Sequence, residues 1–202
     1  MRSEAPSLLP LFRSQHQAEL LAWLYLHPRD EYQATELAGR LGVPLSTLHR
    51  EAQRLVTAGL IHDRRVGRTR LLRAGTEHPV AQALGRLLLL TFGPRTVVGE
   101  AFADVPGVQR VAIYGSWAAR YEGEPGLLPN DVDVLVVGTP SRAAVYEAAD
   151  AAQDRLGLPV NPTVRSPQQW QDAADALVQQ IRASPLVTVI DRDTADSPTA
   201  DH

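Results

Sequence analysis

The chain has 202 residues, of which 44% are hydrophobic and 21% are charged, and it contains no cysteine. This composition is typical of a globular protein with enough apolar residues for one large core or two small ones. The absence of cysteine excludes a disulfide framework, a thiol nucleophile and a thiolate zinc site. The longest apolar run is too short to cross a bilayer and no signal peptide is apparent, so we expect a cytoplasmic protein without a membrane partner.

The net charge of −3 conceals an uneven distribution along the chain. Residues 1–95 carry thirteen arginines against eight acidic residues, which gives a net charge of +5. Residues 96–202 carry seven arginines against fifteen acidic residues, which gives a net charge of −8. A basic half joined to an acidic half predicts two domains with different partners.

Three helices are predicted in the N-terminal half. Apolar residues recur there at helical spacing, and Pro28, Gly42 and Gly59 supply the stop signals. Two short helices separated by a glycine-containing turn form a helix-turn-helix unit, whose second helix enters the major groove of DNA. The predicted helices cover 15–26, 32–41 and 46–59.

A predicted β-hairpin follows the three helices. Its strands cover 60–65 and 69–73, and a tight turn at 66–68 joins them. A helix-turn-helix followed by such a hairpin is a winged helix, and residues 35–73 resemble the winged-helix repressors of the arsenic-repressor and multiple-antibiotic-resistance type. The most similar part is the Ala-Gly-Leu-Ile segment at 58–61 with the Arg-rich hairpin after it. The resemblance implies a transcriptional regulator that binds double-stranded DNA.

Arginines and small polar residues mark the expected DNA-binding surface. Five arginines lie within the ten-residue segment 64–73 of the hairpin, and a guanidinium suits both phosphate oxygens and the narrow minor groove. On the third helix Arg50 suits guanine O6 and N7, and Ser46 and Thr47 suit phosphate. The alternative is a solvated helix face and a solvated hairpin. The candidate DNA-binding residues are Ser46, Thr47, His49, Arg50, Arg54, Arg64, Arg65, Arg68 and Arg70.

A further helix is predicted from Val80 to Leu90, and it is apolar on more than one face. Such a helix needs cover on both sides, either across the two-fold axis of a homodimer or between two domains of one chain. Gly93-Pro94 then marks a domain boundary. We therefore expect a winged-helix domain over 1–93, a second domain over 94–190 and an acidic, disordered tail over 191–202.

The second domain alternates predicted helices and strands. This alternation predicts an α/β domain with a small mixed sheet, and hence an α+β chain as a whole. The predicted helices cover 96–103, 116–121, 141–156 (with Ser141 as N-cap), a segment opening at Pro167, and 175–181. The predicted strands cover 111–114, 132–137, 158–164 and 186–190.

The chemistry of this domain centres on a Gly115-Ser116 turn and on Asp131 and Asp133. The two carboxylates are two residues apart at the start of a strand, so both project from one face and repel each other unless a cation lies between them. A Mg²⁺ ion with substrate phosphates fits such a pair, and the Gly-Ser turn offers phosphates a hydroxyl and backbone N–H groups. The alternative to a metal site is that the two carboxylates are simply exposed to solvent at the end of a strand.

The pattern of Gly-Ser, a loop, Asp-x-Asp and an apolar strand resembles the nucleotidyltransferases of the DNA polymerase beta superfamily, the minimal nucleotidyltransferases in particular. The Ala119-Arg120 and Glu122 positions resemble part of their loop. The resemblance implies Asp131 and Asp133 as catalytic and Mg²⁺-binding residues. It implies Gly115, Ser116 and Arg120 as binding residues for a nucleoside triphosphate.

This sequence departs from that family at the third carboxylate, which active members carry on the next strand. Asn161 and Thr163 occupy the corresponding face here, and neither is a base at neutral pH. The first hypothesis is therefore a DNA-binding regulator whose second domain binds nucleotide and Mg²⁺ as an effector or is degenerate. The alternative is an active nucleotidyltransferase that moves a nucleoside monophosphate to a protein, RNA or small-molecule hydroxyl, within a toxin–antitoxin system for example.

Overall fold

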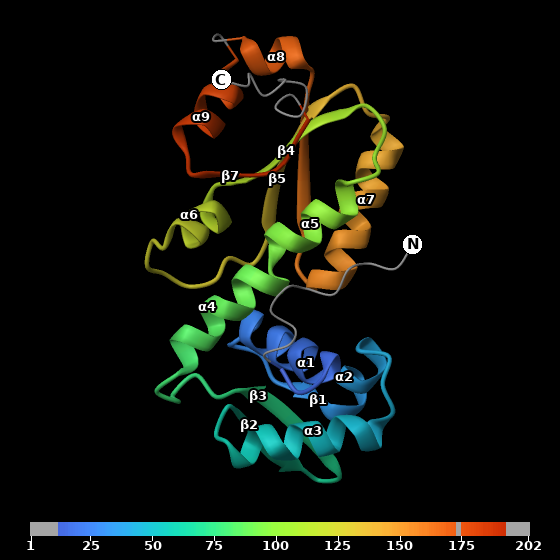
Figure 1. Ribbon diagram of the computed structural model, residues 1–202, viewed down its shortest axis with the longest axis vertical. Coiled ribbons are helices and arrows are strands. Elements are labelled where there is room, and N and C mark those ends of the chain that lie inside the picture. Colours follow the sequence, from blue (N-terminus) through green and yellow to red (C-terminus); the bar gives the residue numbers. More distant parts are fainter. Residues whose placement is uncertain (1–11, 173–174, 193–202) are drawn as a thin grey trace, which may run out of the picture. The chain divides into compact units, whose positions relative to one another are not determined.

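The computed structural model describes residues 12–172 and 175–192 of the chain. The chain divides into two compact units, Met1–Gly93 and Pro94–His202, and each unit has its own sheet and helices (Figure 1). The combination of helices with two small sheets confirms the expected α+β class. Over the described residues, no helix combines the length and the apolar character that a membrane crossing requires.

The first unit packs its helices around an antiparallel sheet with strand order β1-β3-β2. Its core joins Leu20 and Leu24 of the first helix to Leu48 and Leu55 of the third helix and to Leu72 of the hairpin. All five leucines are buried, so the helices and the hairpin share one core. The elements are α1 (Gln15–Leu26), β1 (Tyr32–Gln33), α2 (Ala34–Arg40), α3 (Leu45–Thr57), β2 (Ile61–Val66), β3 (Thr69–Ala74) and α4 (Ala81–Phe92).

Local sequence signals explain why these elements begin and end where they do. The Ser14 side chain accepts a hydrogen bond from the backbone of Gln17 and caps α1. Gly42 has a φ of +63° in the turn between α2 and α3, a conformation that a residue with a Cβ adopts only under strain. The succession of α2, turn, α3 and the β2–β3 hairpin is the winged helix-turn-helix arrangement that the sequence predicts.

The second helix is shorter than the sequence predicts. Tyr32 and Gln33, which we assigned to a helix over 32–41, instead form strand β1 and pair with Leu72 and Leu71 of β3. Gln33 has extended backbone and precedes the first helical residue of α2. Since the strand has only two residues, it shows no alternation of apolar and polar residues in the sequence.

The second unit is built on a mixed sheet with strand order β6-β5-β4-β7. Strands β5 and β6 are parallel, whereas β4 pairs antiparallel with both β5 and β7. The elements are α5 (Pro94–Phe102), β4 (Val108–Tyr114), α6 (Ser116–Glu122), β5 (Val132–Gly138), α7 (Arg142–Leu156), β6 (Val160–Arg165), α8 (Pro167–Gln171), α9 (Ala176–Ala183) and β7 (Leu186–Asp191).

Helices cover both faces of this sheet. Leu135 and Val137 of β5 pack against Ile181 of α9, with Trp170 of α8 beside them. The alternate residues of β5 point to the other face, where α5 and α7 lie (Figure 1). Both faces are therefore dry in the middle of β5, which explains why this strand is a nearly continuous apolar run.

Several predicted boundaries in this unit differ from the observed ones. The first strand begins at Val108 rather than Val111, and the third begins at Val160. The Ser141 side chain caps α7 as predicted. The predicted tail over 191–202 is wrong at its start, because Asp191 belongs to β7 and pairs with Arg110 at 3.0 Å. Residues 193–202 lie outside the described part of the chain.

Candidate functional sites

Helix α3 presents one polar face. Its buried apolar positions are Leu48, Ala52 and Leu55, which recur at helical spacing and fix the orientation of the helix on the core. Ser46 and Arg50 are exposed on the opposite side, one helical turn apart. Thr47, His49 and Arg54, the other predicted residues of this helix, are partly exposed.

The buried carboxylate of Glu51 sets the position of two of the predicted arginines. Glu51 accepts a hydrogen bond of 2.6 Å from Nη1 of Arg54, and the Nε atom of Arg50 lies 4.0 Å away. Gln17 of α1 also reaches this carboxylate, at 3.5 Å. The Arg54 side chain is 36% exposed and that of Arg50 is 62% exposed, so Arg50 is the more available of the two for a ligand.

Arg70 joins the hairpin to α3 rather than pointing into solvent. Its Nε donates to Oδ2 of Asp63 at 2.7 Å, Nη2 donates to Oε1 of Gln53 at 3.2 Å, and Nη1 donates to Nδ1 of His49 at 3.4 Å. The side chain is 11% exposed. We call Arg70, Asp63, Gln53 and His49 the wing clasp, because these contacts hold the hairpin on the polar side of α3.

The tip of the hairpin carries two unpaired cations. Arg65 and Arg68 are exposed on either side of the turn, and neither side chain forms an ion pair or a hydrogen bond with any residue that the structure describes. Gly67 has a φ of +60° in this turn, so glycine is favoured there. The predicted residues Arg65 and Arg68 are thus concentrated at one point with no compensating carboxylate.

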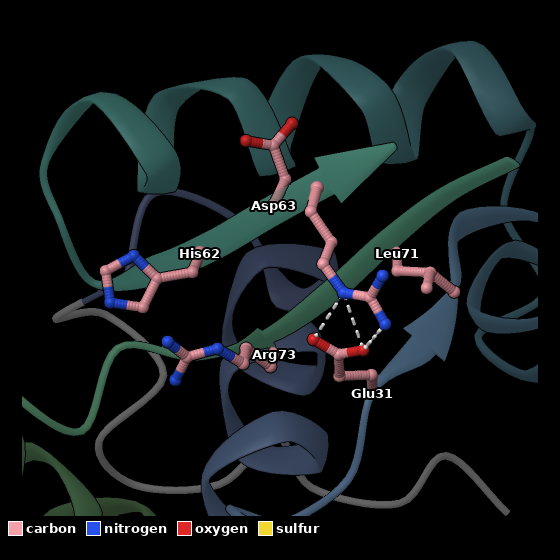
Figure 2. Close-up of a pocket in the computed structure, with 6 residues that line it drawn as sticks. Glu31, His62, Asp63, Leu71 and Arg73 are labelled. Atoms are coloured by element: carbon pink, nitrogen blue, oxygen red, sulfur yellow. Dashed lines mark hydrogen bonds and ion pairs between the residues drawn. The ribbon is translucent and has the colours of Figure 1, made fainter. Parts of the chain in front are cut away.

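Arg64 lies on the face of the hairpin opposite Asp63 and Arg70, where it lines a pocket of about 260 Å³. Figure 2 shows Glu31, His62 and Arg73 on the pocket side, while Asp63 projects from the opposite face of the hairpin toward a helix. The Arg64 guanidinium donates from Nε at 3.0 and 2.9 Å to the two Glu31 oxygens. This forked hydrogen bond lowers the pKa of Glu31 below its ordinary value, and it neutralises Arg64.

The same face holds a second charge cluster around Glu77. The carboxylate accepts from Nε2 of His62 at 2.9 Å and from the Arg73 guanidinium at 3.2 Å. Its own backbone N–H and then His62 and Arg73 lower the pKa of Glu77 to about 2. Of the five hairpin arginines, Arg64, Arg70 and Arg73 are therefore paired with acidic side chains, and Arg65 and Arg68 are not.

In the second unit, strand register brings together the acidic pair and the residue that replaces the third carboxylate. Asp133 is level with Tyr114 on β4 and with Asn161 on β6. Asn161 donates from Nδ2 to Oδ2 of Asp131 at 3.0 Å. Burial first, and the Asp131 carboxylate second, raise the pKa of Asp133, and a hydrogen bond from Asn161 partly opposes them.

The Gly115-Ser116 turn lies beside Asp133. Gly115 has a φ of +69°, and a Cβ at this residue would lie 3.7 Å from Oδ2 of Asp133. Its N–H donates to the carbonyl oxygen of Pro185 at 3.1 Å, so this group is already engaged within the fold. Ser116 begins α6 with an exposed side chain. The predicted turn is therefore adjacent to the acidic pair, with the Gly115 N–H turned toward Pro185.

Arg120 lies against the loop that follows α6. Its Nη2 lies 3.9 Å from Oε2 of Glu124, and its guanidinium packs closely on Gly126. Both of these residues belong to that loop, which Arg120 therefore supports. Its nucleotide-binding role stays a prediction.

The donor set of this site suits a hard divalent cation in part. The carboxylates of Asp131 and Asp133 provide charged oxygen ligands, which Mg²⁺ prefers, and Asn161 adds an uncharged amide. Across residues 12–172 and 175–192, no group of three or more His, Asp or Glu side chains is arranged to hold a metal ion. At this site the described residues therefore offer two charged ligands, Asp131 and Asp133, to Mg²⁺.

Sequence reasoning missed Glu51, Gln53 and Asp63 as parts of the first site. Glu51 is an acidic residue inside an Arg-containing helix, and its i+3 spacing to Arg54 is a signal that the sequence does contain. Gln53 and Asp63 become visible only once the hairpin is placed on α3.

The solved structures named below are similar to about half of the chain. No family model matches, and no curated protein matches. The chain is similar to reduced HlyU from Vibrio cholerae N16961 at 23% identity, covering 41% of this chain and 82% of that one, with a TM-score of 0.34. It is also similar to the transcriptional regulator BldR from Sulfolobus solfataricus at 19% identity, covering 49% and 68%, with a TM-score of 0.36. A third similar structure is HmgR from Pseudomonas aeruginosa, at 19% identity, covering 52% and 44%, with a TM-score of 0.29.

Proposed function

We propose that this protein is a DNA-binding transcriptional regulator that contacts double-stranded DNA through α3 and the hairpin tip. The observation that carries the proposal is the pair Arg65 and Arg68, two uncompensated cations at the tip of a wing whose other arginines are paired. Unpaired guanidiniums suit the phosphate backbone, which dominates affinity in protein–DNA complexes.

The two elements have different tasks in this proposal. Helix α3 enters the major groove, where Arg50 reads guanine O6 and N7 and Ser46 and Thr47 hold phosphate. The wing tip follows the backbone or the minor groove with Arg65 and Arg68. Sequence discrimination therefore comes from α3, and salt-dependent affinity comes from the wing.

The test is a selection of bound sequences from random duplex DNA with the full chain, followed by binding titrations on the selected site. Arg50→Ala is expected to relax one position of the site and to cost about 1–3 kcal/mol there. Arg142→Ala, which removes an exposed arginine at the start of α7 in the other unit, is the matched control for charge. Failure of the wild type to enrich any sequence, or equal effects of the two variants, would overturn the assignment of α3.

A second function is proposed for the second unit, namely binding of a nucleoside triphosphate with Mg²⁺ as an effector. The observation that favours it is the convergence of Asp131, Asp133 and Asn161 next to the Gly115 turn. When bound, Mg²⁺ would supply charge neutralisation for the phosphates, with Asp131 and Asp133 as its protein ligands. Asn161 has no proton-accepting role, so this chain's own residues favour binding over transfer of a nucleoside monophosphate.

Thermal unfolding with each nucleoside triphosphate, with and without Mg²⁺, tests this second proposal. A ligand at about 100 times its dissociation constant should stabilise the protein by about 2.7 kcal/mol. Asp131→Asn is expected to abolish the Mg²⁺-dependent shift. Incorporation of labelled nucleotide into a protein, RNA or small molecule, with loss in Asp133→Ala, would instead support the alternative of an active nucleotidyltransferase.

We also propose that the protein acts as a homodimer, as paired DNA half-sites favour. Helix α4 supports this proposal, because Leu90 is an exposed large hydrophobic residue on a helix whose Leu88 and Leu89 are buried. Sedimentation of wild type and Leu90→Asp tests it, since a monomer in both cases would exclude this helix as the interface.

A further inference from the structure

The wing clasp has a chemical consequence for the tautomer of His49. A guanidinium carries five N–H donors and no acceptor, so in the 3.4 Å contact between Arg70 Nη1 and His49 Nδ1 the imidazole nitrogen must accept. An imidazole that accepts at Nδ1 is neutral and carries its proton on Nε2. Arg70 therefore selects one of the three forms that a histidine ring can adopt.

The geometry of Arg70 fits an orienting role and not a DNA contact. Its side chain is 11% exposed, and three different partners engage its donors on β2 and α3. The Asp63 carboxylate at 2.7 Å balances its charge, so phosphate would gain little from it. Arg70 thus differs from Arg65 and Arg68 at the tip, whose charges have no partner in the described structure.

The ring of His49 keeps one polar atom for a ligand. Its Nε2 makes no hydrogen bond with the residues that the structure describes, and the side chain is partly exposed. His49 lies directly before Arg50 on α3, in the turn that follows Ser46. With the Arg70 contact in place, Nε2–H is a fixed hydrogen-bond donor on the polar side of the helix.

We propose that Arg70 is a positioning residue that holds His49 as the neutral Nε2–H tautomer, and that this N–H is a specificity-determining donor to acceptors on the base edges of DNA. The proposal rests on the function proposed above, since it assigns a second reading residue to α3. The chemical groups it recognises are major-groove acceptors such as guanine O6 and N7 or thymine O4. The charged groups linked to the ring are Arg70 from β3, which contacts it, and Asp63 from β2, which binds Arg70; the charged residues next along α3 are Arg50 and Glu51.

The first experiment measures the tautomer without DNA. Imidazole ¹⁵N spectra of the full chain at about pH 8, where an ordinary histidine is neutral, should show His49 protonated on Nε2 in the wild type. In Arg70→Lys, which keeps the charge and loses the fork, the His49 signals should move toward a mixture of tautomers. Arg73→Lys, a paired arginine on the same strand and the other hairpin face, should leave them unchanged. A wild-type His49 that is protonated on Nδ1, or that is unaffected by Arg70→Lys, overturns the proposal.

The second experiment separates positioning from phosphate contact. For Arg70→Lys and His49→Ala, the ratio of specific to non-specific DNA affinity should fall by about tenfold, and the salt dependence of binding should stay as in the wild type. The double variant should lose no more discrimination than either single variant, because both act through one hydrogen bond. If Arg70→Ala instead lowers the salt slope by about 0.9 and keeps the discrimination, Arg70 is a phosphate contact and the proposal is overturned.

The two experiments can overturn the regulator function and the role of His49 independently of each other. If the wild type binds no DNA, the regulator function falls and the reading role of His49 falls with it, while the spectra alone decide whether Arg70 selects the tautomer. If the wild type binds DNA and His49→Ala keeps full discrimination, the regulator function stands and the reading role of His49 is overturned.

Discussion

At the scale of single residues, Gly115 connects backbone conformation to the acidic site. Its φ of +69° and ψ of −137° lie in a region that L-residues with a Cβ seldom adopt, and an added Cβ would stand 3.7 Å from the Asp133 carboxylate. Because 3.7 Å is an ordinary contact distance, glycine is favoured here by the backbone conformation of the turn and not by lack of space.

We predict that Gly115→Ala destabilises the protein by about 1–3 kcal/mol, the usual cost of a strained backbone conformation. Urea unfolding of the full chain measures this free energy. The matched control is Gly99→Ala in α5, where an added Cβ meets nothing within 4 Å and the residue is helical. The control should stabilise the protein by about 0.5–1 kcal/mol. Equal effects of the two substitutions would contradict the conformational argument.

At the scale of elements, the start of α9 depends on one carboxylate. Asp175 accepts hydrogen bonds at Oδ1 from the backbone N–H groups of Leu177 at 2.9 Å and Val178 at 3.1 Å, and Arg165 donates to its other oxygen. The Val178 hydrogen bond is the largest cause of the lowered pKa of Asp175. Since α9 supplies Ile181 to the core of the second unit, this cap supports the packing of the sheet.

We predict that Asp175→Ala destabilises the protein more than Asp175→Asn, because the amide oxygen of Asn still caps the helix. A folded-state pKa below the unfolded value means that the carboxylate stabilises the fold above the unfolded pKa, near 3.9, and that this contribution is lost as pH falls further. The stability difference between wild type and Asp175→Asn should therefore shrink below about pH 4. A difference that is constant from neutral pH to about pH 2 would contradict the charged cap.

The elements also show how far sequence reasoning reaches. Helices α1 and α3, the hairpin and β5 follow from apolar periodicity and from Gly or Pro at their ends, because these signals are local. Strand β1 does not, since Tyr32 and Gln33 are extended only through their ladder with β3. Tertiary context overrode the helical pattern there.

The two candidate sites were predictable to different degrees, because one depends on local sequence patterns and the other on contacts formed only in the folded chain. The Asp131 and Asp133 pair, with Asn161 opposite, follows from two-residue alternation and from the order of the strands. The arginine cluster was harder to interpret, because its arginines look alike in the sequence and the acidic partner of Arg64 is distant from it. Glu31 lies 33 residues before Arg64, and only the folded sheet shows that this arginine is neutralised. Composition alone therefore overstates the charge that the wing offers to DNA.

At the scale of the whole molecule, the two proposed functions, DNA binding and nucleotide binding, belong to different units of one chain. An effector acts only if it changes the affinity for DNA, and thermodynamic linkage then requires DNA to change the affinity for the effector by the same factor. The two halves carry opposite net charges, so they present different electrostatic fields to an anionic ligand.

We predict that a nucleoside triphosphate with Mg²⁺ shifts the DNA affinity of the full chain by about 5-fold or more, as coupling energies of 1–3 kcal/mol imply. Titrations of DNA at saturating nucleotide, on wild type and Asp131→Asn, measure the shift. The variant should bind DNA as the unliganded wild type does. If nucleotide binds and the DNA affinity stays unchanged, the two units act independently and the effector role is rejected.

The central claim is that the wing tip and α3 bind DNA, and the salt dependence of duplex binding tests it most directly. Arg65→Ala and Arg68→Ala should each lower the slope of the logarithm of the binding constant against the logarithm of salt by about 0.9, for every DNA sequence alike. Arg64→Ala, whose guanidinium is held by Glu31 on the other hairpin face, should change the slope much less. A wild type that binds duplex DNA with no salt dependence, or wing-tip variants that bind as the wild type does, would contradict the account.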